Sequence, residues 1–276
     1  MPSGSARERF IELVRASDHD FNLAEAALLI AAEAYPGLDI DRYVRALDDL
    51  AAAAEPALRG AGSEAERVQR LVRFLTRDAQ FHGNDDDYYD RRNSFLNEVL
   101  DRRTGIPITL AIVYMEVARR LGLPIVGVSF PGHFLIKYSG SPELVVDPFF
   151  GQFLSQTQCE QRLRAVLGPS ARLEPAHLEA ASPREIVVRM LRNLKQVYER
   201  ARELEGALGC SERILLVEPE LAQELRDRGL LYEQLECYAA ARADLERFLT
   251  LAPDDPSADA VRQHLIELGR QGATLH

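Results

Sequence analysis

The first eighty residues carry apolar side chains at helical spacing. The set in residues 21–31 recurs at i, i+3 and i+4, which predicts a helix with one buried face; its members are Phe21, Leu23, Ala24, Ala27, Leu28 and Ala31. Tyr35-Pro36-Gly37 is expected to end this helix. Apolar stripes over 40–50 and 68–75 predict two more helices, and Ser63 followed by Glu66 is typical of a capping box. Residues 7–80 are therefore predicted to be helical, with a packing role.

The pattern changes between residues 81 and 155. The acidic stretch 84–90 lacks the glycine and the distal glutamate of a calcium loop, so it is predicted to be a solvated loop. Residues 93–100 predict a capped helix. A second helix is expected from Pro107 to Arg120, with apolar side chains all around its axis, which indicates burial. Apolar runs over 125–130, 133–138 and 144–147 predict strands. The fold class is therefore α+β, mostly helical, with a small antiparallel sheet.

The last two predicted strands bring one histidine to one aspartate. Ser139-Gly140-Ser141-Pro142 is a turn sequence, and a hairpin centred on Gly140 pairs residues whose numbers sum to 280. His133 and Asp147 meet that condition, so we expect them directly opposite each other, with Cβ atoms about 4.5–5.5 Å apart. An aspartate in that place fixes the tautomer of the histidine. The pair is either the orienter and base of a nucleophilic triad or a structural polar pair.

Residues 183–270 repeat with a period of 34. Positions that far apart carry the same residue type: Leu191 and Leu225, Tyr198 and Tyr232, Ala207 and Ala241, Leu215 and Leu249, Pro219 and Pro253. This period is typical of tetratricopeptide repeats, which are pairs of antiparallel helices. Lys195 stands in the first copy where the second has Gly229, so the first copy is the weaker match. Chance similarity between ordinary helical hairpins is the alternative. A helix over 258–268 is expected to close the stack.

Composition narrows the function classes. The 276 residues carry a net charge of −10, from 33 basic and 43 acidic side chains, which argues against nucleic-acid binding because that needs a basic surface. No apolar run approaches the roughly 18 residues of a membrane span, and the start of the chain lacks a secretory signal. Cys159, Cys210 and Cys237 form no CxxC pair, which predicts reduced thiols. We expect a cytoplasmic protein with no metal, no cofactor and no membrane partner.

The basic residues have an unusual composition. All of them are arginine except Lys137 and Lys195. Together with the many alanines, this bias is typical of a GC-rich bacterial genome.

The segment from Pro107 to Pro124, followed by His133 and Asp147-Pro148, resembles the transglutaminase-like core of the papain-type cysteine enzymes. In that pattern a cysteine opens a helix, and Gly-hydrophobic-Pro follows about fifteen positions later. Gly122-Leu123-Pro124 sets the register here and puts Pro107 at the cysteine position. The resemblance implies that His133 and Asp147 are the catalytic histidine and aspartate, here vestigial, because proline has no nucleophilic side chain.

A set of motifs resembles a more specific group, the SirB-type bacterial family, over about residues 10–270. These motifs are Asn93-Ser94-Phe95-Leu96, the segments 103–110 and 130–135, and Asp147-Pro148-Phe149. The resemblance implies a transglutaminase-like domain followed by tetratricopeptide repeats. We expect the first domain, with the N-terminal helices, over 1–180 and the repeats over 181–276. It also implies that proline is usual at position 107.

Two functional hypotheses follow. The first is a non-catalytic interaction or regulatory module, whose degenerate domain holds a pocket and whose repeats bind a protein or peptide partner. Asn93 and Thr109 are the predicted binding residues. The second is a hydrolase or acyl transferase of altered chemistry, in which His133 and Asp147 activate water. The missing nucleophile favours the first; no oligomeric state is predicted.

Overall fold

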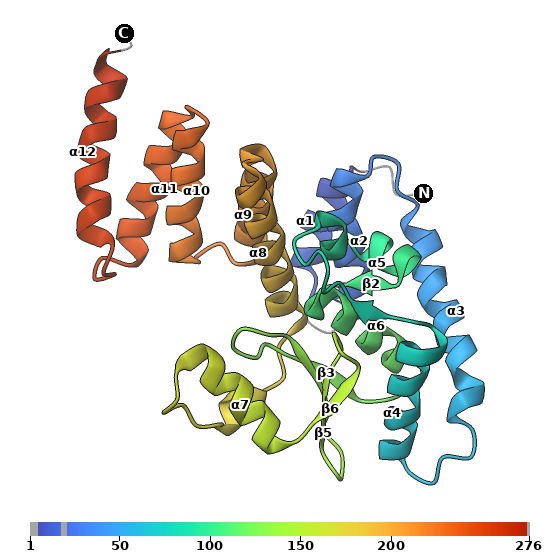
Figure 1. Ribbon diagram of the computed structural model, residues 1–276. Helices are drawn as coiled ribbons and strands as arrows, with labels where there is room; N and C mark the ends of the chain where they lie inside the picture. The colour runs from blue at the N-terminus through green and yellow to red at the C-terminus, as the bar shows by residue number, and fades with distance from the viewer. Residues whose placement is uncertain (1–4, 18–20, 275–276) are drawn as a thin grey trace. The chain divides into compact units, whose positions relative to one another are not determined.

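The structure is a computed structural model that describes residues 5–17 and 21–274 (Figure 1). It consists of two compact units, Met1–Met190 and Leu191–His276. The division lies ten residues beyond the boundary predicted at 180/181. The reason is that the first half of α8 (Pro183–Ala201) packs within the first unit, where Arg184 donates hydrogen bonds to the carbonyl oxygens of Val14 and Ala16.

The N-terminal part of the first unit is helical, as predicted. It contains α1 (Ala6–Arg15), α2 (Leu23–Ala34), α3 (Ile40–Leu58), α4 (Glu64–Arg73) and the π-helical turn η1 (Phe74–Asp78). Ser63 caps α4 by accepting a hydrogen bond from the Glu66 amide at 3.1 Å. The Glu66 carboxylate accepts from the Gly62 amide at 2.7 Å, so only half of the predicted capping box forms.

Two short helices connect two strands that pair in parallel. The 3-10 turn η2 (Arg91–Ser94) and α5 (Leu96–Arg102) replace the single helix predicted over 93–100. Strands β1 (His82–Gly83) and β2 (Thr104–Gly105) pair in parallel, which the sequence pattern did not indicate. The helix predicted from Pro107 is α6 (Pro107–Arg120), and every residue from Pro107 to Ala118 is buried. It contacts α2, α3, α5 and strands β3 and β4.

The antiparallel sheet has the order β3-β4-β5-β6. Its strands are β3 (Ile125–Val128), β4 (Leu135–Tyr138), β5 (Leu144–Asp147) and the unpredicted β6 (Gln152–Leu154). Ile136 pairs with Val146 and Tyr138 with Leu144, so paired numbers sum to 282 and the predicted register is wrong by two residues. His133 lies before β4, outside the strand expected to contain it.

Both faces of this sheet are covered. One face carries Val128, Leu135, Val145 and Leu154, which form a core with Cys159 and Leu163 of α7 (Gln156–Leu167). Ala171, Leu173 and Leu178 pack against it, the last from the 3-10 turn η3 (Pro175–Leu178). Ile136 and Val146 alternate onto the opposite face and are buried as well.

The second unit consists of helical hairpins. The end of α8 is followed by α9 (Leu204–Val217), α10 (Ala222–Gln234), α11 (Tyr238–Leu251) and α12 (Ala258–Thr274). Ala207 and Ala241 are fully buried. A Cβ at Gly229 would lie 2.9 Å from Cγ of Leu245 and 3.2 Å from the carbonyl oxygen of Ala241. Small residues therefore allow α10 and α11 to approach closely, as the 34-residue pattern predicts.

Lys195 occupies the position that corresponds to Gly229. Its Nζ lies 2.6 Å from Oε1 of Glu224 and 3.4 Å from Oδ2 of Asp227. Ser211 donates a hydrogen bond to the same Glu224 oxygen. The first copy thus has a buried ion pair where the second has closely packed helices.

Candidate functional site

His133 and Asp147 are in direct contact. Nε2 of His133 lies 2.9 Å from Oδ1 of Asp147. Asp147 is the last residue of β5 and is fully buried, whereas the His133 side chain is 19% exposed. With Asp147 ionised, Nε2 donates the hydrogen bond and Nδ1 is the acceptor nitrogen. Among the described residues none forms a hydrogen bond with Nδ1, so this atom remains available for proton exchange.

Asp147 is held from three sides. Besides His133, its Oδ1 accepts a hydrogen bond from the Phe149 amide at 2.9 Å. Nη2 of Arg162, on α7, lies 2.8 Å from Oδ2, an ion pair whose angles fall outside those of a hydrogen bond. The buried carboxylate is therefore compensated by a cation and by donors, as a buried charge requires.

The turn that carries His133 is fixed by α8. Nη2 of Arg189 donates to the carbonyl oxygens of Phe130 at 3.2 Å and of His133 at 3.0 Å, and Nη1 donates to Oγ of Ser129. Gly132 has φ of +69°, and a Cβ there would lie 2.6 Å from Cγ2 of Val166. A side chain at position 132 would therefore be both strained and obstructed.

Pro107 is the first residue of α6 and is buried. It offers no nucleophile and no N–H at the position where the papain-type pattern has a cysteine. Among the described residues no hydrogen bond joins His133 to a cysteine; Cys159 is buried in the core between the sheet and α7, and Cys210 and Cys237 lie in the second unit. Burial raises the pKa of the Cys159 thiol and raises that of Cys210 to about 12.

Asn93 and Thr109 are fully buried and bound within the protein. Oγ1 of Thr109 donates to the Asn93 carbonyl oxygen at 2.7 Å and accepts from the Ile106 amide at 3.2 Å. Nδ2 of Asn93 donates to the carbonyl oxygen of Asp87 at 2.8 Å. These contacts fasten the loop 84–94 to the start of α6, which is a structural role. The binding role predicted for both residues stays a prediction.

One aromatic ring, that of Phe149, lies beside the histidine and contacts two further aromatic rings. The Phe149 ring lies 6.4 Å from that of His133, 6.0 Å from Tyr88 and 4.9 Å from Phe150. Tyr88 and Phe150 are 42% and 50% exposed. A Cβ at Gly83 would collide with the Phe149 ring, so the glycine in β1 makes room for it. An exposed aromatic surface thus adjoins the histidine.

Tyr114, on α6, carries a buried hydroxyl without a hydrogen-bond partner among the described residues. Burial, and then the nearby charge of Asp147, raises its pKa well above the ordinary value. Sequence reasoning missed Tyr114, Arg162 and Arg189. No local motif marks any of the three, because their roles depend on contacts with elements far away in the chain.

The described residues contain no group of three or more His, Cys, Asp or Glu side chains suited to hold a metal. Within residues 5–17 and 21–274, no helix has the length and apolarity needed to cross a membrane.

Comparison with known proteins agrees with this arrangement. The sequence profile of the Transglutaminase-like superfamily matches residues 41–192, and that of the Tetratricopeptide repeat matches residues 194–265. A protein of Xylella fastidiosa (strain 9a5c) named UPF0162 protein is 41% identical over 273 residues, covering 96% of each chain. Protein SirB1 of Salmonella typhimurium is 29% identical over 232 residues, covering 83% of this chain and 86% of that protein.

A crystal structure of menin, titled as revealing the binding site for Mixed Lineage Leukemia (MLL) protein, aligns with 90% of this chain and 69% of that one. Its TM-score is 0.41 at 11% identity, which is too low to support a conclusion. The sequence profiles and the bacterial relatives are sufficient: the chain belongs to the transglutaminase-like superfamily, carries tetratricopeptide repeats after that domain, and is related to bacterial proteins named UPF0162 protein and SirB1.

Proposed function

We propose that this chain is a non-catalytic protein-interaction module with a regulatory role. The observation that carries the proposal is Pro107 at the first position of α6. Thiol acyl transfer needs a thiolate beside the histidine, and proline supplies none. Without a nucleophile, the histidine and the aspartate keep a structural role, in which Arg162 pairs with the Asp147 carboxylate and Arg189 binds the carbonyl oxygen of His133.

The repeats are the proposed binding surface for a protein or peptide partner. Stacked helical hairpins form extended surfaces that accept peptide segments. Exposed apolar residues are present on these helices, among them Leu230 of α10 at 37% and Ile266 of α12 at 50% exposure. The net charge of −10 disfavours nucleic acid as the partner. The three free cysteines support a cytoplasmic location, because the cytosol keeps thiols reduced.

The test is affinity purification with the full chain as bait, comparing wild type, Leu230→Asp and His133→Ala. We expect a bound protein to be lost with Leu230→Asp and retained with His133→Ala. Circular dichroism and melting temperature establish that both variants are folded. Loss of the partner with His133→Ala but not with Leu230→Asp contradicts binding by the repeats. An acyl adduct found on the wild-type chain by intact-mass spectrometry contradicts the absence of catalysis.

The alternative function, a hydrolase of altered chemistry, has one observation in its favour. Nδ1 of His133 is available, and the side chain is 19% exposed, so a water bound there would meet a base oriented by Asp147. In that case ester hydrolysis by the wild type should disappear in His133→Ala and fall in Asp147→Asn. Equal rates in all three proteins exclude this alternative.

A further inference from the structure

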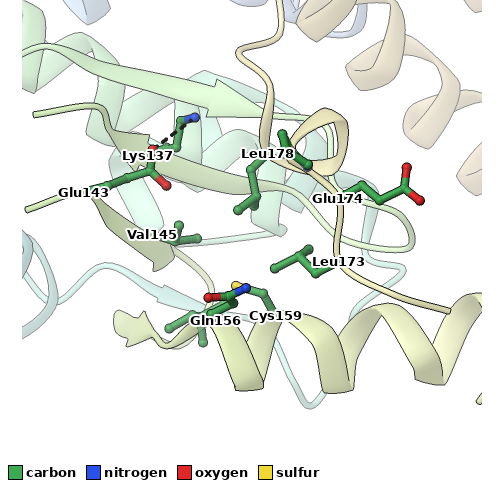
Figure 2. Close-up of a pocket in the computed structure, with 10 residues that line it drawn as sticks. Lys137, Glu143, Val145, Gln156, Cys159, Leu173, Glu174 and Leu178 are labelled. Carbon is green, nitrogen blue, oxygen red and sulfur yellow. Dashed lines mark ion pairs between the residues drawn. The ribbon is translucent and has the colours of Figure 1, made fainter.

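A cavity lies in the first unit, and neither His133 nor Asp147 is among the residues that line it. It has a volume of about 420 Å³ and is formed by β4, β5, the end of β6, α7 and the segment 173–178 (Figure 2). Val145, Leu154, Cys159, Leu173 and Leu178 provide apolar walls, and Figure 2 shows Leu173 pointing toward its centre. Lys137, Glu143, Gln156 and Glu174 supply its polar groups. The volume is typical of a site for a small molecule.

Lys137 is an unusual residue in this chain. It is one of two lysines among 33 basic residues, and both lysines are shielded from solvent. Lys195 is explained by its contacts, since two carboxylates of the second unit lie within 3.4 Å of its Nζ. Lys137 has a side chain that is only 14% exposed, in the middle of a strand, where a compact ammonium fits better than the wide fork of arginine.

The contacts of Lys137 leave its ammonium incompletely bound. Its one ion pair among the described residues is with Oε2 of Glu143 at 3.5 Å, and no hydrogen bond from Nζ to a described residue accompanies it. The Glu143 side chain is 50% exposed, so it can turn into solvent at little cost. Figure 2 shows the ammonium and Glu143 at one side of the cavity, with Glu174 turned outward. The main chain of Glu174 is tied to η3, since its amide donates a hydrogen bond to Nδ1 of His177 and its carbonyl oxygen accepts one from the His177 amide.

We propose that this cavity binds a small carboxylic acid with an apolar body, of on the order of ten non-hydrogen atoms. The carboxylate replaces Glu143 on Nζ of Lys137 and receives charge-assisted hydrogen bonds from it. The apolar body occupies the space between Val145, Leu173 and Leu178. A shielded ammonium with free donors at the edge of an apolar cavity is complementary to this class of ligand in both charge and polarity. The site is independent of the function proposed above.

The test measures binding of sodium hexanoate by isothermal titration calorimetry. Hexylamine and hexanol are compared as cationic and neutral compounds of matched length. We expect hexanoate to bind in the millimolar range or tighter, about tenfold more tightly than the other two, because a hydrogen bond to a charged group is worth roughly that factor. Equal binding of the three compounds, or no binding of hexanoate, overturns the proposal.

Two variants should change the affinity in opposite directions. Lys137→Met keeps the stem of the side chain but removes the charge, and should weaken hexanoate binding about tenfold. Glu143→Gln removes the competing carboxylate and should tighten it. Glu179→Gln, at an exposed carboxylate outside the lining of the cavity, is the matched control and should leave it unchanged. If Lys137→Met does not fold, an unchanged affinity in Glu143→Gln is sufficient to refute the proposal.

Two further measurements test where the carboxylate binds and whether it belongs to a small acid or to the C-terminus of a peptide. Hexanoate should slow alkylation of Cys159, which lines the cavity, but not of the exposed Cys237; an unaffected Cys159 overturns the assignment. N-acetylleucine mimics the C-terminus of a peptide. If it binds tenfold more tightly than hexanoate, the ligand is a chain terminus and the small-acid proposal is wrong.

Discussion

Replacing Ala241 by leucine tests whether the repeat packing is as tight as described. Ala241 is fully buried on α11, and its carbonyl oxygen lies 3.2 Å from the position of a Cβ on Gly229 of α10. Leu245, one turn further along α11, occupies the remaining space at 2.9 Å from that position. The three added carbon atoms of leucine therefore have no cavity to enter, and overpacking should lower the free energy of unfolding by about 1–3 kcal/mol.

The assay is thermal unfolding of the full chain by calorimetry. We expect a single transition, because two repeats bury too little surface to be stable alone. A loss of about 2 kcal/mol should then lower the melting temperature by roughly 4–8 °C for a chain of this size. Ala243→Leu, at an exposed position of the same helix, is the control and should change stability by less than about 0.5 kcal/mol. Equal melting temperatures for the two variants refute the close approach of α10 and α11, and two separate transitions refute the single cooperative unit.

Three other substitutions test the first position of α6 and the buried polar contacts. Pro107→Cys should create a thiol whose pKa is lowered by the helix N-terminus, so its alkylation by iodoacetamide should persist at lower pH than that of Cys237; a higher pH midpoint contradicts this. Lys195→Met should lower the free energy of unfolding by about 3–5 kcal/mol because the buried Glu224 loses its cation. Adding Glu224→Gln to that variant should restore part of the lost free energy. If urea unfolding shows that the losses of the two substitutions simply add, the ion pair does not have this role. Thr109→Val should cost about 1–3 kcal/mol, because two buried main-chain groups lose their hydroxyl partner, whereas Thr109→Ser should remain close to wild type; equal urea midpoints for valine and serine would falsify the role of the hydroxyl.

The helices could be predicted from the sequence because their signals are local. The start of α6 at Pro107 follows from the fixed φ of proline and its missing N–H. The repeat hairpins follow from small residues such as Gly229 and Ala241 at fixed spacing, where only a small side chain lets two helices approach. The shorter elements were not predicted. β1, β2 and β6 have two or three residues each, which is too short for an alternating pattern.

The register of the hairpin could not be predicted from the alternation of apolar and polar residues along its strands. A shift of two residues leaves every side chain on the same face of the sheet, so alternation could not distinguish a sum of 280 from the observed 282. The contact between His133 and Asp147 forms nevertheless, because His133 lies in the turn before β4 and is positioned by Arg189 rather than by strand pairing.

The sequence by itself determined the helical hairpins, the α+β class and the absence of a nucleophile at position 107, because each depends on residue type and on spacing along the chain. Only the tertiary structure decided the partners of the charged groups. Arg162 reaches Asp147 from α7, and Lys137 faces an apolar cavity closed by the segment 173–178. These groups are far apart in the chain, and their contacts depend on how separate elements pack, which spacing along the chain does not encode.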